Sequence, residues 1–71
     1  MLLLDLISLI QDSTTVIISD LNNNEVARYD GKNSIPNKYN NKKVVEISAY
    51  IENKKAVIRI QLNFIQIYKS P

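Results

Sequence analysis

Few side-chain types in this chain are able to carry chemistry. The 71 residues include no Cys and no His, which removes disulfides, thiolate and imidazole metal sites, and the usual catalytic triads. No glycine-rich phosphate loop, nucleophile elbow or EF-hand loop occurs. Acid–base work or cation binding would fall to three carboxylates near element ends, Asp12, Asp20 and Asp30. Asp at an element end is ordinary turn chemistry, so we expect no enzyme, no metal and no cofactor.

Cationic and aromatic side chains are interleaved in the middle of the chain. Cations neutralise phosphates and tyrosines stack on bases, so such a mixture suits a nucleotide-like ligand. The alternative is ordinary structure, with Tyr in half-buried strand positions and Lys at solvated turns. General nucleic-acid binding is not expected, because the net charge is only +2. The candidate ligand-binding residues are Arg28, Tyr29, Lys32, Tyr39, Lys42 and Lys43.

An apolar segment near the C-terminus is the candidate oligomer interface. A core made from so short a chain supplies only roughly 3–5 kcal/mol, and without disulfides or a metal the remaining reinforcement is self-association. Exposed apolar strand residues in a small chain often mark a subunit contact. We therefore expect a homo-oligomer, most simply a dimer, formed through Phe64, Ile65, Ile67 and Tyr68.

The elements that position these groups begin with a helix. From Leu2 to Gln11, apolar residues recur at the spacing of one helical face, as Leu3, Leu6, Ile7 and Ile10. Three further leucines, Leu2, Leu4 and Leu9, widen the apolar stripe. This pattern predicts an amphipathic helix that is buried on more than one side.

Four strands are predicted after the helix. Residues 14–20 and 25–30 are expected to pair through an asparagine-rich turn at 22–24. Residues 43–50 and 55–62 alternate as two half-buried strands and form a second hairpin, with Val45, Ile47 and Ala49 on one face. The loop 31–42 between the hairpins opens with Gly31, which is expected to need a positive φ.

These elements predict a single α+β domain over residues 1–71. Its helix packs on an antiparallel sheet of four to five strands, and 63–71 form a final strand or tail extension; the alternative is a small SH3-like barrel. No stretch approaches the ~20 apolar residues of a membrane span, and the N-terminal leucines lack the flanks of an export signal. A cytoplasmic location is expected.

Several short segments carry a resemblance. Leu6-Ile7-Ser8-Leu9-Ile10, Thr15-Val16-Ile17-Ile18, Tyr29-Asp30-Gly31-Lys32 and Ser34-Ile35-Pro36 resemble small uncharacterised proteins encoded by phages and mobile elements of low-GC Gram-positive bacteria. The resemblance implies a non-enzymatic inhibitor that binds stoichiometrically and sequesters a host defence protein or a nucleotide signal. The alternative function is a structural or assembly protein that forms a homo-oligomer.

Overall fold

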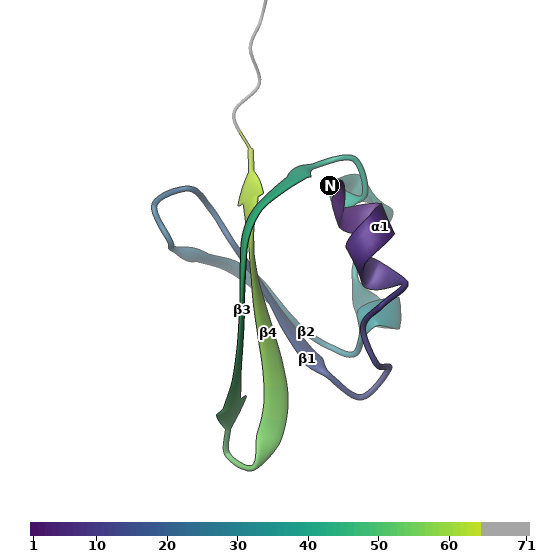
Figure 1. Cartoon of the computed structure of the whole chain (residues 1–71), viewed down its shortest axis with the longest axis vertical. Helices are drawn as coiled ribbons and strands as arrows, with labels where there is room; N and C mark the ends of the chain where they lie inside the picture. Colours follow the sequence, from purple (N-terminus) through teal and green to yellow (C-terminus); the bar gives the residue numbers. More distant parts are fainter. Residues whose placement is uncertain (65–71) are drawn as a thin grey trace, which may run out of the picture.

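The computed structural model describes residues 1–64 and shows one short helix followed by two β-hairpins (Figure 1). The expected α+β class is confirmed. The helix and strands are α1 (Leu3–Ile7), β1 (Thr15–Ser19), β2 (Glu25–Asp30), β3 (Lys43–Glu52) and β4 (Lys55–Asn63). Two 3-10 turns, η1 (Lys32–Ser34) and η2 (Asn37–Tyr39), lie between the hairpins.

The sheet is mixed, so the prediction of an antiparallel sheet is wrong. Both hairpins form, but the strand order is β2-β1-β4-β3, and β1 pairs with β4 in parallel, from Thr15 opposite Val57 to Ser19 opposite Gln61. The segment 31–42 takes the chain from one edge of the sheet to the other, which brings β4 beside β1. Since β2 and β3 are the two edges and do not pair, the sheet is open and does not close into a barrel.

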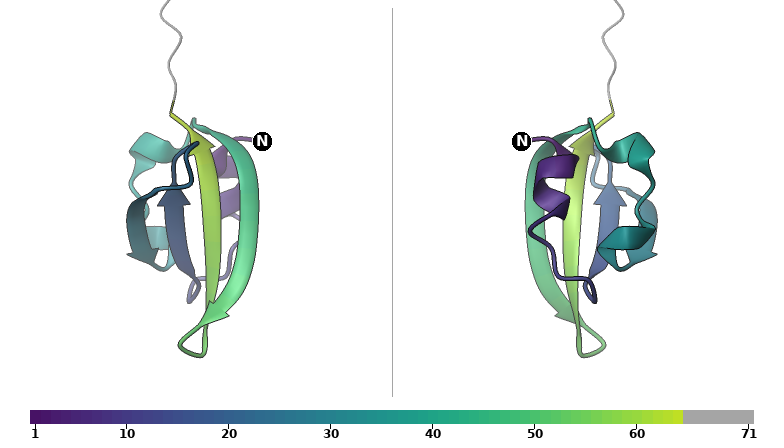
Figure 2. Two further views of the ribbon diagram at one scale, coloured as in Figure 1. Left: turned by 90° about the vertical axis from the view of Figure 1, so that its left-hand side faces the viewer. Right: turned by 90° about the vertical axis from the view of Figure 1, so that its right-hand side faces the viewer.

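The core lies on one face of this sheet. Figure 2 shows that α1 and the two 3-10 turns cover the same face, with α1 on the β4 and β3 side and the turns on the β1 and β2 side. The residues buried together come from every layer: Leu3, Leu6, Ile10, Val16, Ile18, Ile35, Tyr39, Ile60 and Leu62. Helix α1 sits at the Lys43 end of β3, where Leu2 forms a bridge with Lys43.

The helix is shorter and less buried than its leucine content predicts. Leu3, Leu6 and Ile10 are buried, as the helical spacing predicts, whereas Leu4 and Leu9 are 55% and 75% exposed. The expectation of burial on more than one side is therefore wrong. The Ser8 hydroxyl donates to the carbonyl of Asp5 over 3.0 Å, and a side chain that bonds to the backbone in this way competes with continued helix. In the described residues, no helix is long and apolar enough to cross a membrane.

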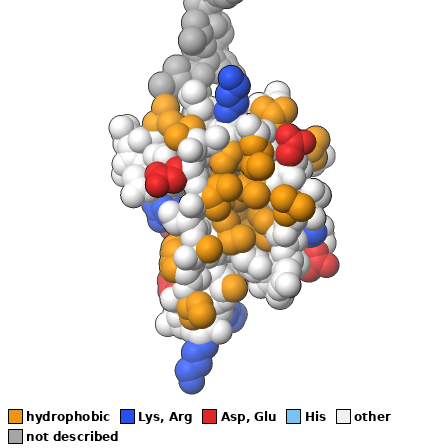
Figure 3. Space-filling model, viewed as in Figure 1, with side chains coloured by type: hydrophobic (Ala, Val, Ile, Leu, Met, Phe, Trp, Pro, Cys, Tyr) orange, Lys and Arg blue, Asp and Glu red, His pale blue; other side chains and the backbone are white. Residues whose placement is uncertain are grey.

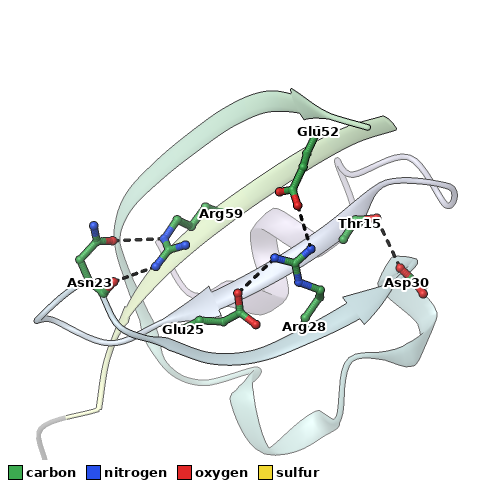
Figure 4. A network of polar contacts seen from close by, with 7 residues as sticks. All are labelled: Thr15, Asn23, Glu25, Arg28, Asp30, Glu52 and Arg59. Carbon is green, nitrogen blue, oxygen red and sulfur yellow. Dashed lines mark hydrogen bonds and ion pairs between the residues drawn. The ribbon is translucent and has the colours of Figure 1, made fainter. Parts of the chain in front are cut away.

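The second face of the sheet is apolar at its centre and charged at its rim. Ile17 is 0% exposed and Val57 is 3% exposed, although both point away from the core. Figure 4 shows Arg28 reaching across this face, from Glu25 on its own strand to Glu52 at the end of β3. The long stem of an arginine can cover apolar surface while its head stays in water. Strand β1 is thus buried on both faces.

Candidate functional site

Strand β3 is the longest strand and one of the two edges of the sheet. It has ten residues, and none of them is buried. Only its beginning is covered from outside: the Leu3 N–H donates to the carbonyl of Lys42 (3.0 Å), and the Val44 N–H donates to that of Met1 (2.8 Å). From Val45 to Glu52, no strand among residues 1–64 pairs with the outer edge.

The hairpin turn fixes which backbone groups of β3 face outward. Asn53 and Lys54 have φ of 52° and 65°, as in a two-residue hairpin turn in which Glu52 and Lys55 flank the bend. The backbone groups of Glu52 therefore face β4, and successive residues alternate in direction. Counting back from the turn, the outward N–H and C=O groups belong to Ile51, Ala49 and Ile47.

The side chains on the core side of β3 are apolar but uncovered. Ile47 is 44% exposed and Ile51 is 77% exposed. The predicted grouping of Val45 with Ile47 and Ala49 on one face does not hold, because the pairing is irregular between Val44 and Glu46 and it is Val44, opposite Leu62, that packs against the core. The expectation that 43–50 is half-buried is therefore wrong, because α1 covers only one end of the hairpin. Figure 3 shows hydrophobic side chains gathered in the space between β3 and α1. We call Ile47, Ala49 and Ile51, with their open backbone edge, the β3 strip.

The β3 strip lacks most of the features that protect natural edge strands. Such strands usually carry lysine or proline, inward-pointing charges or bulges, because an unprotected edge is a template for another chain. Between Glu46 and Glu52 there is no lysine and no proline, and the pairing irregularity lies before this segment. The two glutamates lie on the second face, since they alternate with Ile47 and Ile51. The strip can therefore receive an added strand.

The structure brings together only part of the predicted ligand site. Tyr29 and Tyr39 meet edge to face, with ring centroids 6.3 Å apart, and hydrogen bonding with Tyr39, followed by burial, raises the pKa of the Tyr29 phenol above its ordinary value. The Lys42 Nζ lies 6.0 Å from the ring centroid of Phe64. Beside them is a hollow of about 380 Å³, lined by Val26, Lys38, Tyr39, Lys42 and Phe64.

The other predicted ligand residues lie elsewhere. Arg28 is on the opposite face, where hydrogen bonding and charge from Glu25, and then Glu52, raise its pKa further. Lys32 pairs with Asp12 over 3.6 Å. Lys43 stands exposed at the start of β3. The predicted set is thus divided between the two faces of the sheet. Arg28 and Tyr29 are separated because successive side chains of a strand point to opposite faces.

The three carboxylates considered for chemistry do not converge. Asp12 and Asp30 both line a polar hollow of about 610 Å³. Asp20 lies at the other end of β1, where its carboxylate accepts the N–H groups of Asn22 and Asn24, each over 2.9 Å. Within residues 1–64, no three carboxylates lie close enough together to hold a metal ion.

The predicted oligomer interface lies mostly outside the described residues. Ile65, Ile67 and Tyr68 fall beyond residue 64. Phe64 is half-buried and packs edge-on against Tyr39, with ring centroids 6.0 Å apart. The sequence reasoning missed the β3 strip. Its signal was the apolar alternation that continues from Ile47 to Ile51, but alternation alone cannot show which hairpin strand lies at an edge.

Comparison with known proteins adds no relative. No family model, no curated protein and no solved structure matches this chain. The function is therefore argued from the geometry of the chain itself.

Proposed function

We propose that this protein is a non-enzymatic binding protein that pairs stoichiometrically with another polypeptide through the β3 strip. The observation that carries the proposal is the coincidence of an unpaired backbone edge with exposed apolar side chains on the same strand, Ile47 and Ile51. Either feature alone is common on protein surfaces. Together they supply the two parts of strand addition: main-chain hydrogen bonds give affinity, and alternate side chains give specificity.

The inhibitor role implied by the sequence resemblance is compatible with this mode of action. An inhibitor that sequesters its target needs a binding surface and no catalytic group. Strand addition meets that need with one exposed strand, which suits a chain of 71 residues. We propose a cytoplasmic site of action, in agreement with the lack of cysteine.

The proposal is tested by cross-linking in the producing cells with a lysine-reactive reagent, because Lys43, Lys54 and Lys55 flank the β3 strip. Two variants with matched exposure are compared. Ile51→Glu places a charge on the strip, where Ile51 is 77% exposed, and Leu9→Glu places one beyond α1, where Leu9 is 75% exposed. We expect Ile51→Glu to lose the cross-linked species and Leu9→Glu to keep them. Equal cross-linking in both variants would show that binding does not use the strip.

A second candidate function is the capture of a small phosphorylated ligand. It is favoured by the hollow that Lys38 and Lys42 share with two aromatic rings, since cations and rings together suit a phosphate and a base. Titration with ADP as the probe, followed by NMR, is expected to shift the signals of Tyr39 and Phe64. Lys42→Ala should weaken the effect, and Arg28→Ala, on the opposite face, should not. Shifts that never saturate, or that survive Lys42→Ala, would exclude this site.

A further inference from the structure

We infer that the partner of the β3 strip is an extended segment of another protein in which apolar and basic residues alternate. This assignment rests on the proposed function, because it names the chemistry of the polypeptide that the strip binds. A strand added to a sheet edge directs successive side chains to opposite faces. The two rows of side chains on β3 therefore each select one set of partner residues.

One end of this edge already holds an added segment of backbone. Met1 to Leu3 run antiparallel to the start of β3, with Leu2 opposite Lys43, and two backbone hydrogen bonds of 2.8 and 3.0 Å join them. The twist of the edge therefore accepts another strand. Residues 45–52 are the part that stays open, and they set the length of the segment that can pair.

The row on the core side selects apolar partner residues. Ile47 and Ile51 are 44% and 77% exposed, and Ala49 lies between them. Residues directly opposite in a strand pair lie on the same face, so an apolar partner side chain covers each member of this row. Ala49 is small, and a larger apolar side chain such as leucine fits opposite it.

The row on the second face is acidic and includes an exposed ring. Its members alternate with the β3 strip and are Glu46, Ser48, Tyr50 and Glu52. Glu46 is exposed, and no cation pairs with it within residues 1–64. Glu52 contacts Arg28 over 3.5 Å, yet its side chain is still 41% exposed. Tyr50 is 39% exposed, and the face of a tyrosine ring attracts arginine or lysine.

The charges along β3 place the basic residues of the partner within this segment. Residues 45–52 contain no lysine and no arginine, whereas Lys43 precedes them and Lys54 and Lys55 follow them. Opposite charges across a strand pair stabilise it, and like charges destabilise it. A basic residue therefore fits opposite Glu46, while an acidic one at that position is repelled.

Two synthetic peptides test this charge preference. Both have seven residues and blocked ends, with valine, leucine and valine at alternate positions. The other four residues are all arginine in one peptide and all glutamate in the other. Each peptide is titrated into isotope-labelled protein and followed by NMR. We expect the arginine peptide to shift the amide signals of Ile47, Ala49 and Ile51 to saturation, with a dissociation constant about 2- to 30-fold below that of the glutamate peptide.

A matched pair of charge reversals locates the effect. Glu46→Lys should bring the two dissociation constants together or reverse their order. Glu25→Lys makes the same change in net charge on β2, at the other edge of the sheet, and should leave the preference for the arginine peptide as it is. A preference that Glu46→Lys does not alter would overturn the inference.

The remaining outcomes separate a wrong partner from a wrong binding surface. Equal binding of both peptides at the strip, or tighter binding of the glutamate peptide, would overturn the basic partner and leave strand addition at the β3 strip standing. Strip signals that move with protein concentration alone would show that a second copy occupies the edge, which also overturns the basic partner. If neither peptide shifts these signals, the basic partner is wrong, and the cross-linking of Ile51→Glu decides the proposed function separately.

Discussion

Gly31 holds a backbone conformation that other residues adopt only with strain. Its φ is +95°, and a Cβ built at this position would meet the carbonyl oxygen of Asp12 at 2.7 Å. The N–H of Gly31 also donates to the carbonyl of Thr14 over 3.1 Å. The glycine thus ends β2 and lets the chain turn toward η1, which confirms the positive φ predicted from its place after a strand.

Replacing this glycine should destabilise the fold. We expect Gly31→Ala to lower the free energy of unfolding by about 1–3 kcal/mol, the usual cost of a strained backbone position. Urea denaturation measures the change. Asn33→Ala, two residues along in an exposed position, is the control and should change the free energy by less than about 0.5 kcal/mol. Similar values for both variants would mean that the loop adjusts without strain.

Tyr29 gives the fold a dependence on alkaline pH. Its pKa is raised above the ordinary value of 10.0 by hydrogen bonding with Tyr39 and by burial, so the folded state favours the protonated phenol. This contribution to stability is complete below the ordinary pKa and is lost as the pH rises through the raised pKa. As the pH rises above 10.0, the ordinary pKa of the phenol, the stability advantage of the natural protein over Tyr29→Phe should therefore shrink. A difference that stays constant above that pH would contradict the assignment.

Strand β1 is the element on which both faces of the sheet depend. Its five residues are all buried, and it lies between β2 and β4. The second face of β1 has no helix over it. Ile17 is nevertheless fully buried. Its partner across the β1–β2 pair is Arg28, which reaches over this face toward Glu52 (Figure 4).

A pair of isoleucine variants compares this strand with the edge. Ile17→Ala should cost about 2–5 kcal/mol, as for other fully buried isoleucines. Ile47→Ala on β3, where the side chain is 44% exposed, should cost less than about 1 kcal/mol. Thermal or urea denaturation of dilute protein gives both values. A small cost at Ile17 would mean that the second face is not packed, and a large cost at Ile47 would mean that β3 is covered.

How well the sequence predicts these elements depends on how far apart along the chain the interacting residues lie. The turn at Asn22 to Asn24 and the hairpin bend after Glu52 depend on neighbouring residues, and both form. The parallel pairing of β1 with β4 joins residues more than 40 positions apart, and alternation within a strand carries no information about it. The exposure of β3 follows from that pairing, so the strip was missed and the strand was predicted as half-buried.

The predicted ligand residues are divided between two faces of the sheet for a related reason. Arg28 and Tyr29 are adjacent in the chain but point to opposite faces of β2. Arg28 also finds Glu52, a residue of the other hairpin, 3.5 Å away. The sequence shows which cationic and aromatic side chains are near one another along the chain. Only the strand order shows which of them share a surface. Tyr39 and Lys42 do share one, beside the hollow that Phe64 completes.

At the scale of the whole molecule, the helix and the 3-10 turns cover only part of one face of the sheet within residues 1–64. The core is covered by α1 at one end of β3 and by the 3-10 turns on the β1 and β2 side, and the rest of β3 has neither (Figure 2). A chain of this length buries a smaller fraction of its surface than a larger domain does. We therefore propose that the uncovered part of β3 is the surface through which this protein binds a partner.

The most direct test of this claim is amide hydrogen exchange along β3, resolved by residue with NMR. In dilute protein, the amides of Ile47, Ala49 and Ile51 should exchange rapidly while those of Ser48 and Tyr50, which face β4, stay protected. Protection of all five amides in dilute monomer would show that the edge is already covered by the chain itself, and the proposed binding surface would not exist.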